Sequence, residues 1–270
     1  MSAAVTTSLL WSLQSDQGPG ISYLMGTMHI RDRRAFSVWE DMTSRLSACA
    51  VFAAEVDLDD LSEAVAPGSL ASYFSTPQSL QQYLSARRFE RLRHMLLKGV
   101  QLDIGRFQHL PPIVLVQLID ERLLATDYPT SLDERLWQYA KTNDKQLVGL
   151  ESWSKQLQLL QGIPYDEQVR LLLDIGRHFS RRRRQLSRIA TLYEQGNMRQ
   201  LYLSARHGAG RLRKVILLER NNALADHIAR LANSQTTFAA IGAAHLCGGK
   251  GVIRLLKKQG FKVEPILLNH

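Results

Sequence analysis

Hydrophobic positions follow two different patterns along the chain, one near its ends and another in its middle. Near both ends, short apolar runs of strand length stand between glycines and polar residues. In the middle, apolar residues recur mostly every three or four positions, as they do on one face of a helix. The pattern therefore predicts strand-rich ends and a largely helical middle.

The N-terminal part predicts the order strand, helix, strand. The run ISYLMG at 21–26 is apolar and bounded by glycine, and residues 35–48 place apolar side chains at helical spacing. The run CAVFAAEVDL at 49–58 is almost unbroken, which is typical of a strand covered on both faces. A βαβ unit is expected here.

The C-terminal part repeats this order. The run TTFAAIG at 236–242 predicts a strand, and residues 249–260 predict a helix that ends at Gly260. A last strand is predicted over 261–268, where Pro265 favours an edge position because proline cannot donate a ladder hydrogen bond. A second βαβ unit is expected at this end.

Helices dominate the predicted middle, with one short strand at 145–151. Ser131 and Glu134 form the S-x-x-E capping pattern of a helix start. The predicted helices are 79–99, 111–125, 131–144, 152–162, 166–196 and about 210–234. No linker rich in Pro, Gly or Ser interrupts the chain, so we expect one domain over 1–270. Its expected fold is α/β (or α+β), with a mixed central sheet and a large helical insertion over about 70–235.

Composition places the chain among ordinary globular proteins, with 270 residues, 45% hydrophobic and 22% charged. It has no apolar run of the roughly 18 residues that a membrane span needs. The N-terminus lacks the basic and long apolar regions of a signal peptide, and two cysteines, Cys49 and Cys247, make no disulfide framework. We therefore expect a cytoplasmic protein without a transmembrane segment.

The net charge of +9 raises the question of an anionic partner. Much of this charge lies in the arginine-rich segment 177–188, which is expected to be helical. Four consecutive arginines wrap around a helix, and no aromatic residues are interleaved for base stacking. A solvated basic surface is favoured over a specific nucleic-acid site, although an acidic partner or a membrane surface stays open.

Four polar residues follow predicted strands, and they indicate where chemistry would occur. His29, Glu55, Glu151 and His245 each lie at or just past a strand end. The carboxyl ends of parallel strands share one edge of a sheet, where ligands bind in α/β folds. Two imidazoles and one carboxylate are a common metal set. We therefore expect these side chains to converge.

Each of these signals also has a purely structural explanation. A single G-x-x-H is weak evidence, because a histidine after a strand is more often a hydrogen-bonded structural residue. Glu55 is harder to explain in this way, since the apolar run AVFAAE would bury its carboxylate, and a buried carboxylate is rare unless it has a partner. Two copies of G-x-x-H together with strand-end carboxylates favour a functional site.

These segments resemble the TraB/GumN (TraB/PrgY/GumN) family, which includes the Tiki metalloproteases of animals. LMGTMHI and AAIGAAHLCGGKGVIRLLKKQGFKV are similar to the two G-x-x-H segments of the family, and CAVFAAEVDL to its Glu-bearing strand. SLDERLWQYAKTNDKQLVGLES and LLERNNALADHIARL are similar to its Leu-Asp to Gly-Leu-Glu region and its Arg-Asn helix. The resemblance covers nearly the whole chain.

The resemblance implies a fold related to metal-dependent hydrolases, with His29, His245 and Glu55 at the active centre. Arg220 would pair with a carboxylate of the site or with a developing oxyanion, or else form a surface salt bridge with Glu219. Asn221 is a second-tier candidate. So is Asp133, which could instead cap a helix.

The expected function is metal-assisted hydrolysis of a peptide or another amide or ester. A divalent ion on His29, His245 and Glu55 would activate a water, and manganese, cobalt, iron and zinc all stay open. Glu55 or Glu151 could instead act as general base. Cys247 is expected to pack rather than to attack a substrate. The alternative is a binding or regulatory protein of the TraB/PrgY type that keeps the fold without turnover.

Overall fold

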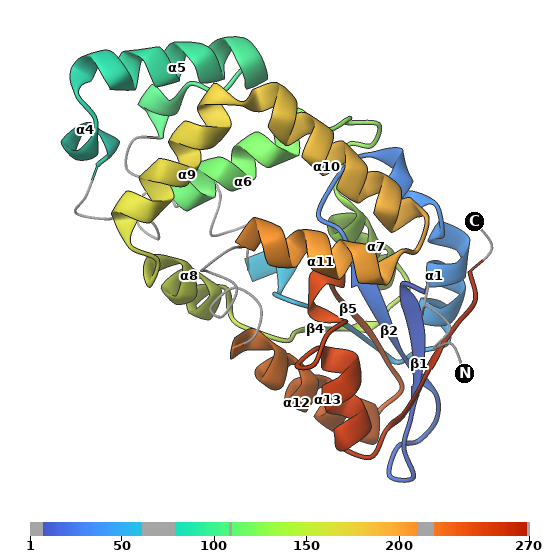
Figure 1. Ribbon diagram of the computed structural model, residues 1–270. Helices are drawn as coiled ribbons and strands as arrows, with labels where there is room; N and C mark the ends of the chain where they lie inside the picture. The colour runs from blue at the N-terminus through green and yellow to red at the C-terminus, as the bar shows by residue number, and fades with distance from the viewer. Residues whose placement is uncertain (1–7, 61–78, 108–109, 210–218, 269–270) are drawn as a thin grey trace, which may run out of the picture. The chain divides into compact units, whose positions relative to one another are not determined.

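A six-stranded mixed sheet forms the centre of the computed structural model, which describes residues 8–60, 79–107, 110–209 and 219–268 (Figure 1). The strands lie in the order β4-β3-β5-β2-β1-β6. Their bounds are Leu10–Gln14 (β1), Ser22–Thr27 (β2), Val51–Ala54 (β3), Gln146–Gly149 (β4), Thr237–Gly242 (β5) and Lys262–Pro265 (β6). The mixed α/β class predicted from the sequence is confirmed.

One strand of the sheet, β1, runs in the opposite direction to the others. β4, β3, β5 and β2 pair in parallel, whereas β1 is antiparallel to both β2 and β6. β6 lies at the edge of the sheet, as Pro265 indicated. β1 was not anticipated from the sequence. The four parallel strands end at one edge of the sheet, so the loops that follow them lie together there.

The parallel strands are apolar because helices cover the sheet. Every residue of β3 is buried, and Phe52 on β3 stacks on Phe238 of β5 with ring centroids 6.1 Å apart. Trp137 of α7 packs against Phe52, with the two rings in an edge-on (T-shaped) arrangement. Helices that pack on the sheet or on one another are α1 (Trp39–Ser47), α7 (Leu132–Thr142), α12 (Glu219–Ser234) and α13 (Val252–Lys258).

The described residues fall into two compact units. The first holds the sheet and comprises 1–58, 127–153 and 189–270, and the second is helical and comprises 59–126 and 154–188. Helices of the second unit include α4 (Leu80–Tyr83), α5 (Ala86–Val100), α6 (Pro112–Leu123) and α9 (Tyr165–Arg177). The single domain expected over 1–270 stays a prediction.

Helix α8 (Trp153–Gln161) begins at the last residue of the first unit's segment 127–153 and continues in the second unit. Helix α10 (Phe179–Glu194) begins in the second unit, and α11 (Met198–Ala209) belongs to the first. The predicted helix over 166–196 is in fact α9 and α10, because the backbone at His178 (φ −127°, ψ 40°) leaves the helical region. The predicted helix over 79–99 is likewise divided into α4 and α5. Periodicity alone misses such breaks, since each half keeps its own apolar face.

The predicted helix at about 210–234 is described from Glu219 onward as α12, and its residues 210–218 lie outside the described part of the chain. The helix α11 before it was not anticipated. None of the helices in the described residues is long and apolar enough to cross a membrane.

Candidate active site

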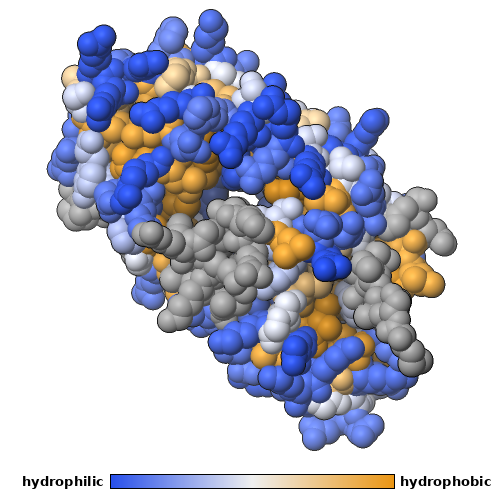
Figure 2. All heavy atoms as spheres, in the orientation of Figure 1, coloured by the Kyte–Doolittle hydropathy of each residue, from blue (hydrophilic) through white to orange (hydrophobic). Residues whose placement is uncertain are grey.

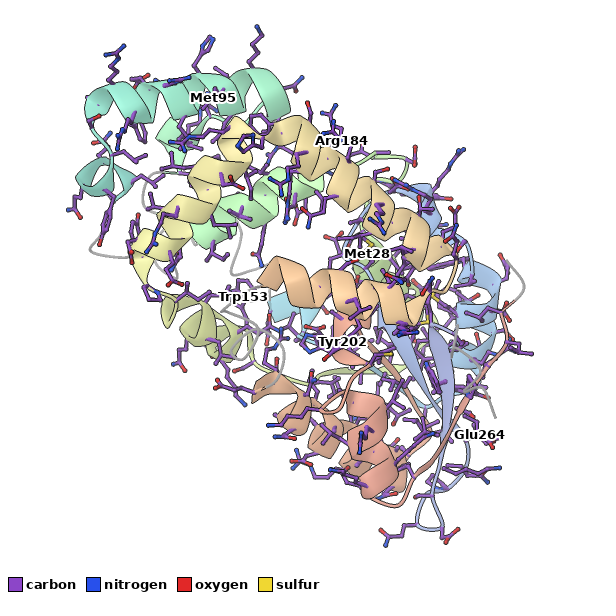
Figure 3. All side chains as sticks on the ribbon, viewed as in Figure 1. Met28, Met95, Trp153, Arg184, Tyr202 and Glu264 are labelled. Atoms are coloured by element: carbon purple, nitrogen blue, oxygen red, sulfur yellow. The ribbon has the colours of Figure 1, made fainter. Side chains whose placement is uncertain are left out.

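The loops after the four parallel strands carry the polar residues that the sequence singled out. His29 follows β2 by two residues, Glu55 follows β3 directly, and Glu151 follows β4 by two residues. His245 ends the short 3-10 helix Ala243–His245, which follows β5. Helix α7 contributes Asp133 near its start, and α12 contributes Arg220 and Asn221. Figure 3 labels Met28, the neighbour of His29 in the loop after β2.

Glu55 and Glu151 are held together by a single arginine. The Glu151 N–H donates to the Glu55 carbonyl at 2.8 Å, so the two residues are neighbours at the ends of β3 and β4. Arg220 donates its Nη2 to Glu55 Oε2 at 2.5 Å and its Nε to Glu151 Oε2 at 2.7 Å. Arg220 therefore joins two buried carboxylates of the site and is not limited to a surface role.

Glu55 is ionised although it is only 8% exposed. Burial alone would raise its pKa, but His245, which is protonated in the acid range where Glu55 titrates, and Arg220 lower it further than burial raises it. His29 and the Gly242 N–H, which donates to Glu55 Oε1 at 2.6 Å, act in the same direction. The net result is a carboxyl pKa well below its usual range, so the site holds a buried anion at neutral pH.

The ring of His245 has a defined orientation. Asn221 Nδ2 donates to the Lys250 carbonyl at 2.7 Å, which turns Asn221 Oδ1 toward His245 Nδ1 at 2.6 Å. Because this amide oxygen can only accept, the proton of His245 is on Nδ1. Nε2 therefore faces Glu55 Oε1, 3.9 Å away. Burial lowers the pKa of His245 to about 4 despite the opposing effect of Glu55, so the ring is neutral.

His29 lies in a different environment. Its Nδ1 is 2.9 Å from Asp133 Oδ2, and Asp133 Oδ1 accepts a hydrogen bond from Thr27 Oγ1 at 2.6 Å. The negative charge of Asp133 raises the pKa of His29 to about 9. The His29 side chain is 58% exposed, so water screens part of this attraction. Thr27 had no recognisable signal in the sequence.

Asp133 does not cap α7. Ser131 is the N-cap, its side chain accepts from the Glu134 N–H, and Glu134 reaches back to the Ser131 N–H at 2.7 Å. The capping box predicted from the sequence is therefore confirmed. The carboxylate of Asp133 contacts His29 instead.

The glycine of each G-x-x-H segment is explained by space. A Cβ on Gly26 would lie 2.7 Å from Leu246 Cδ1 and 3.1 Å from Ala243 Cα, and a Cβ on Gly242 would lie 3.0 Å from Glu55 Oε1. Glycine therefore lets the loops after β2 and β5 approach each other and lets the Glu55 carboxylate approach the backbone. Tyr193 also donates its hydroxyl to the Gly26 carbonyl at 2.7 Å.

A comparison with known protein families identifies the family of this chain. The model of the TraB/PrgY/gumN family matches residues 9–265, nearly the whole chain. The chain belongs to the TraB/PrgY/gumN family. A search of curated proteins and a search of solved structures found no match.

The donor chemistry of this family member fits a divalent ion. His29 and His245 each hold an oxygen acceptor through Nδ1, which leaves Nε2 for a ligand bond, and metal-binding histidines are oriented in this way. Glu55 supplies an ionised carboxylate beside His245. Within the described ranges, no three His, Cys, Asp or Glu side chains already form a metal-binding group. Ion binding would therefore require side-chain movement.

Cys247 remains a thiol at neutral pH in this TraB/PrgY/gumN protein. Burial raises its pKa, and a nucleophilic cysteine needs the opposite shift. Figure 3 labels Tyr202 on α11, whose ring would be 2.5 Å from a Cβ on Gly248, next to Cys247. Close packing in this loop agrees with the expectation that Cys247 packs.

Arg135 makes an interaction that sequence reasoning missed. Its guanidinium carbon lies 4.6 Å from the ring centroid of Trp39, 5.0 Å from that of Tyr128 and 5.5 Å from that of Phe36. A pocket of about 570 Å³ is lined by these residues. Cation–π attraction here joins α7 to the segment that follows β2, so it holds together the two elements that carry Asp133 and His29.

Proposed function

We propose that this TraB/PrgY/gumN protein is a metal-dependent hydrolase that cleaves a peptide or another amide or ester bond, in the manner of a metallopeptidase. The observation that carries the proposal is the orientation of the two histidines. Both direct Nε2 away from an oxygen acceptor that holds Nδ1, and one of them lies beside an ionised, buried carboxylate. Two imidazoles and a carboxylate would leave positions open for water and substrate once His29 has lost its proton.

His29, His245 and Glu55 would hold the ion. Once bound, a divalent ion such as manganese, cobalt, iron or zinc polarises the scissile carbonyl and lowers the pKa of a bound water toward about 7. His245 is already neutral, whereas His29 must lose a proton from Nε2 to become a ligand.

The remaining polar residues orient the side chains of the site and balance its charge. Arg220 pairs with Glu151 through Nε and with Glu55 through Nη2, so its other N–H groups are the ones that would meet a developing oxyanion. Glu151 is the candidate general base. Asn221 acts through His245 by holding its proton on Nδ1.

The alternative is a binding or regulatory protein that keeps the fold without turnover. Arg220 favours it, because an ion pair satisfied within the chain balances the buried carboxylates without any metal ion. The two functions differ in whether the purified protein carries metal in stoichiometric amount.

Metal analysis followed by a peptide-library assay tests the proposal. Protein purified without chelator should contain stoichiometric metal, and the His29→Ala and His245→Ala variants should lose it together with hydrolysis. His94→Ala, on the exposed face of α5, is the matched control and should retain both. Equal metal content in all four proteins would exclude these histidines as ligands.

A further inference from the structure

Helix α10 presents a stripe of arginines on its solvent face. Arg181, Arg184 and Arg188 are exposed, and their spacing of three and four residues places them on one side of the helix. The opposite side carries the buried Leu186. Figure 3 labels Arg184 within this stripe. The arginine run does wrap around the helix, and exposed Arg183 lies off this side, but Arg181, Arg184 and Arg188 share one face.

Helix α5 presents a second basic stripe in the same helical unit. Arg87, Arg91, His94 and Lys98 are exposed at spacings of four, three and four, opposite the buried residues Phe89, Leu92, Leu96 and Val100. The end of α5 meets the start of α10, because a Cβ on Gly99 would lie 3.1 Å from the Phe179 ring. Figure 2 shows hydrophilic side chains along both helices.

Two arginines of these helices, Arg182 and Arg93, are neutralised by carboxylates, whereas those of the α10 stripe are not. Arg182 pairs with Asp120, and Arg93 pairs with Asp103 at 2.7 Å. In the part of the chain that the structure describes, Arg181, Arg184 and Arg188 make no ion pair. Like charges three or four residues apart on a helix repel one another. The stripe therefore keeps a repulsion that a multivalent anion would relieve.

The side chains around the stripe narrow the class of anion that the stripe could bind. Ser180, Gln185 and Ser187 lie between the arginines. The stripe has no aromatic ring on which single-stranded bases could stack, and no large apolar side chain that could enter a bilayer or form the apolar centre of a protein interface. Leu97, 47% exposed on the flank of α5, is a single exposed leucine, which is common on protein surfaces.

Guanidinium groups bind phosphate oxygens in pairs, and duplex nucleic acid offers about one negative charge per 1.7 Å of its axis. From Arg181 to Arg188 the stripe extends roughly 10 Å along the helix, so it can meet several phosphates. We propose that the α5–α10 surface binds the phosphodiester backbone of double-stranded nucleic acid without sequence preference. This binding is independent of the proposed hydrolase site.

Fluorescence anisotropy with labelled duplex DNA and duplex RNA, between 50 and 200 mM salt, tests the proposal with the full chain. The variant Arg181→Gln/Arg184→Gln/Arg188→Gln should bind about tenfold or more weakly at the lowest salt. Its slope of log affinity against log salt should be smaller by roughly 3, about one for each phosphate that the variant no longer neutralises. A variant with Arg87, Arg91 and Lys98 changed to Gln should weaken binding in the same way.

A charge-matched control distinguishes this surface from net charge. Arg254→Gln/Lys257→Gln/Lys258→Gln removes the same charge from exposed positions of α13 and should change affinity less than twofold. Equal losses in both triple variants would overturn the proposal. So would tighter binding to single-stranded DNA than to duplex, or an α10-dependent binding found only with phosphatidylserine vesicles or polyglutamate.

Discussion

The two G-x-x-H segments end neighbouring parallel strands, yet their histidines have opposite properties. His245 is buried beside a neutral amide, Asn221, and burial lowers its pKa to about 4. His29 is exposed beside a carboxylate, Asp133, which raises its pKa to about 9. The same motif therefore places a ring at the same edge of the sheet, while the residue that holds Nδ1 decides its charge.

The largest expected effect concerns the charge balance that keeps the His245 side of the site intact. Arg220→Met should lower the free energy of unfolding by about 3–5 kcal/mol, because it removes the cation that pairs with two buried carboxylates. Urea denaturation measures this loss. Arg230→Met, at an exposed position of the same helix, is the control and should change stability little. Equal effects of the two substitutions would contradict a buried charge network.

The pH dependence of metal binding should reveal the difference between the two rings. Protonation of His29 competes with an ion up to about pH 9, whereas His245 does not compete above about pH 4. Affinity for manganese should therefore rise roughly tenfold per pH unit from pH 7 toward pH 9. Calorimetric titration at pH 7, 8 and 9 measures the rise.

Asp133→Asn is the matched variant for this measurement. Without the carboxylate, the pKa of His29 should return toward about 6.5, and the rise in affinity above pH 7 should disappear. A manganese affinity that is the same at pH 7 and pH 9 in the unsubstituted protein would show that His29 is not a ligand.

Replacing the motif glycine should affect the packing between the two segments. Gly26→Ala should destabilise the protein by about 1–3 kcal/mol, because the new Cβ would press on Ala243 Cα and Leu246. Gly249→Ala is the control, since no atom lies within 4 Å of its Cβ. Thermal melting of both variants is the measurement, and similar melting temperatures would mean that the loops can move apart without cost.

The smallest expected effect is the contribution of the His29–Asp133 pair to stability. Because the folded pKa of His29 is raised, this contribution is fully present below about pH 6.5 and is lost as pH rises through about 9. Solvent exposure of His29 limits it to about 1 kcal/mol or less. His29→Gln should therefore destabilise the protein slightly at pH 6 and not at pH 9.5, as measured by urea denaturation at the two pH values. A loss that grows with pH would mean that the charged pair does not stabilise the fold.

Local pattern was sufficient for most of the fold. Apolar runs located the parallel strands, the S-x-x-E pattern located the start of α7, and Pro265 placed β6 at the edge. The local sequence pattern was insufficient at His178, where one non-helical residue separates α9 from α10. It was also insufficient at β1, which has no motif of its own. Such features depend on neighbours that are distant in sequence.

The candidate residues themselves were visible in the sequence because strand ends and buried carboxylates leave a local signal. Their partners were not. Asp133 lies 106 residues from Thr27, which holds it, and Arg220 lies 165 residues from Glu55. Electrostatic environment is set by atoms within a few ångströms in space. The sequence alone therefore determined which side chains reach the edge of the sheet, and only the tertiary structure decided that one histidine is charged and the other neutral.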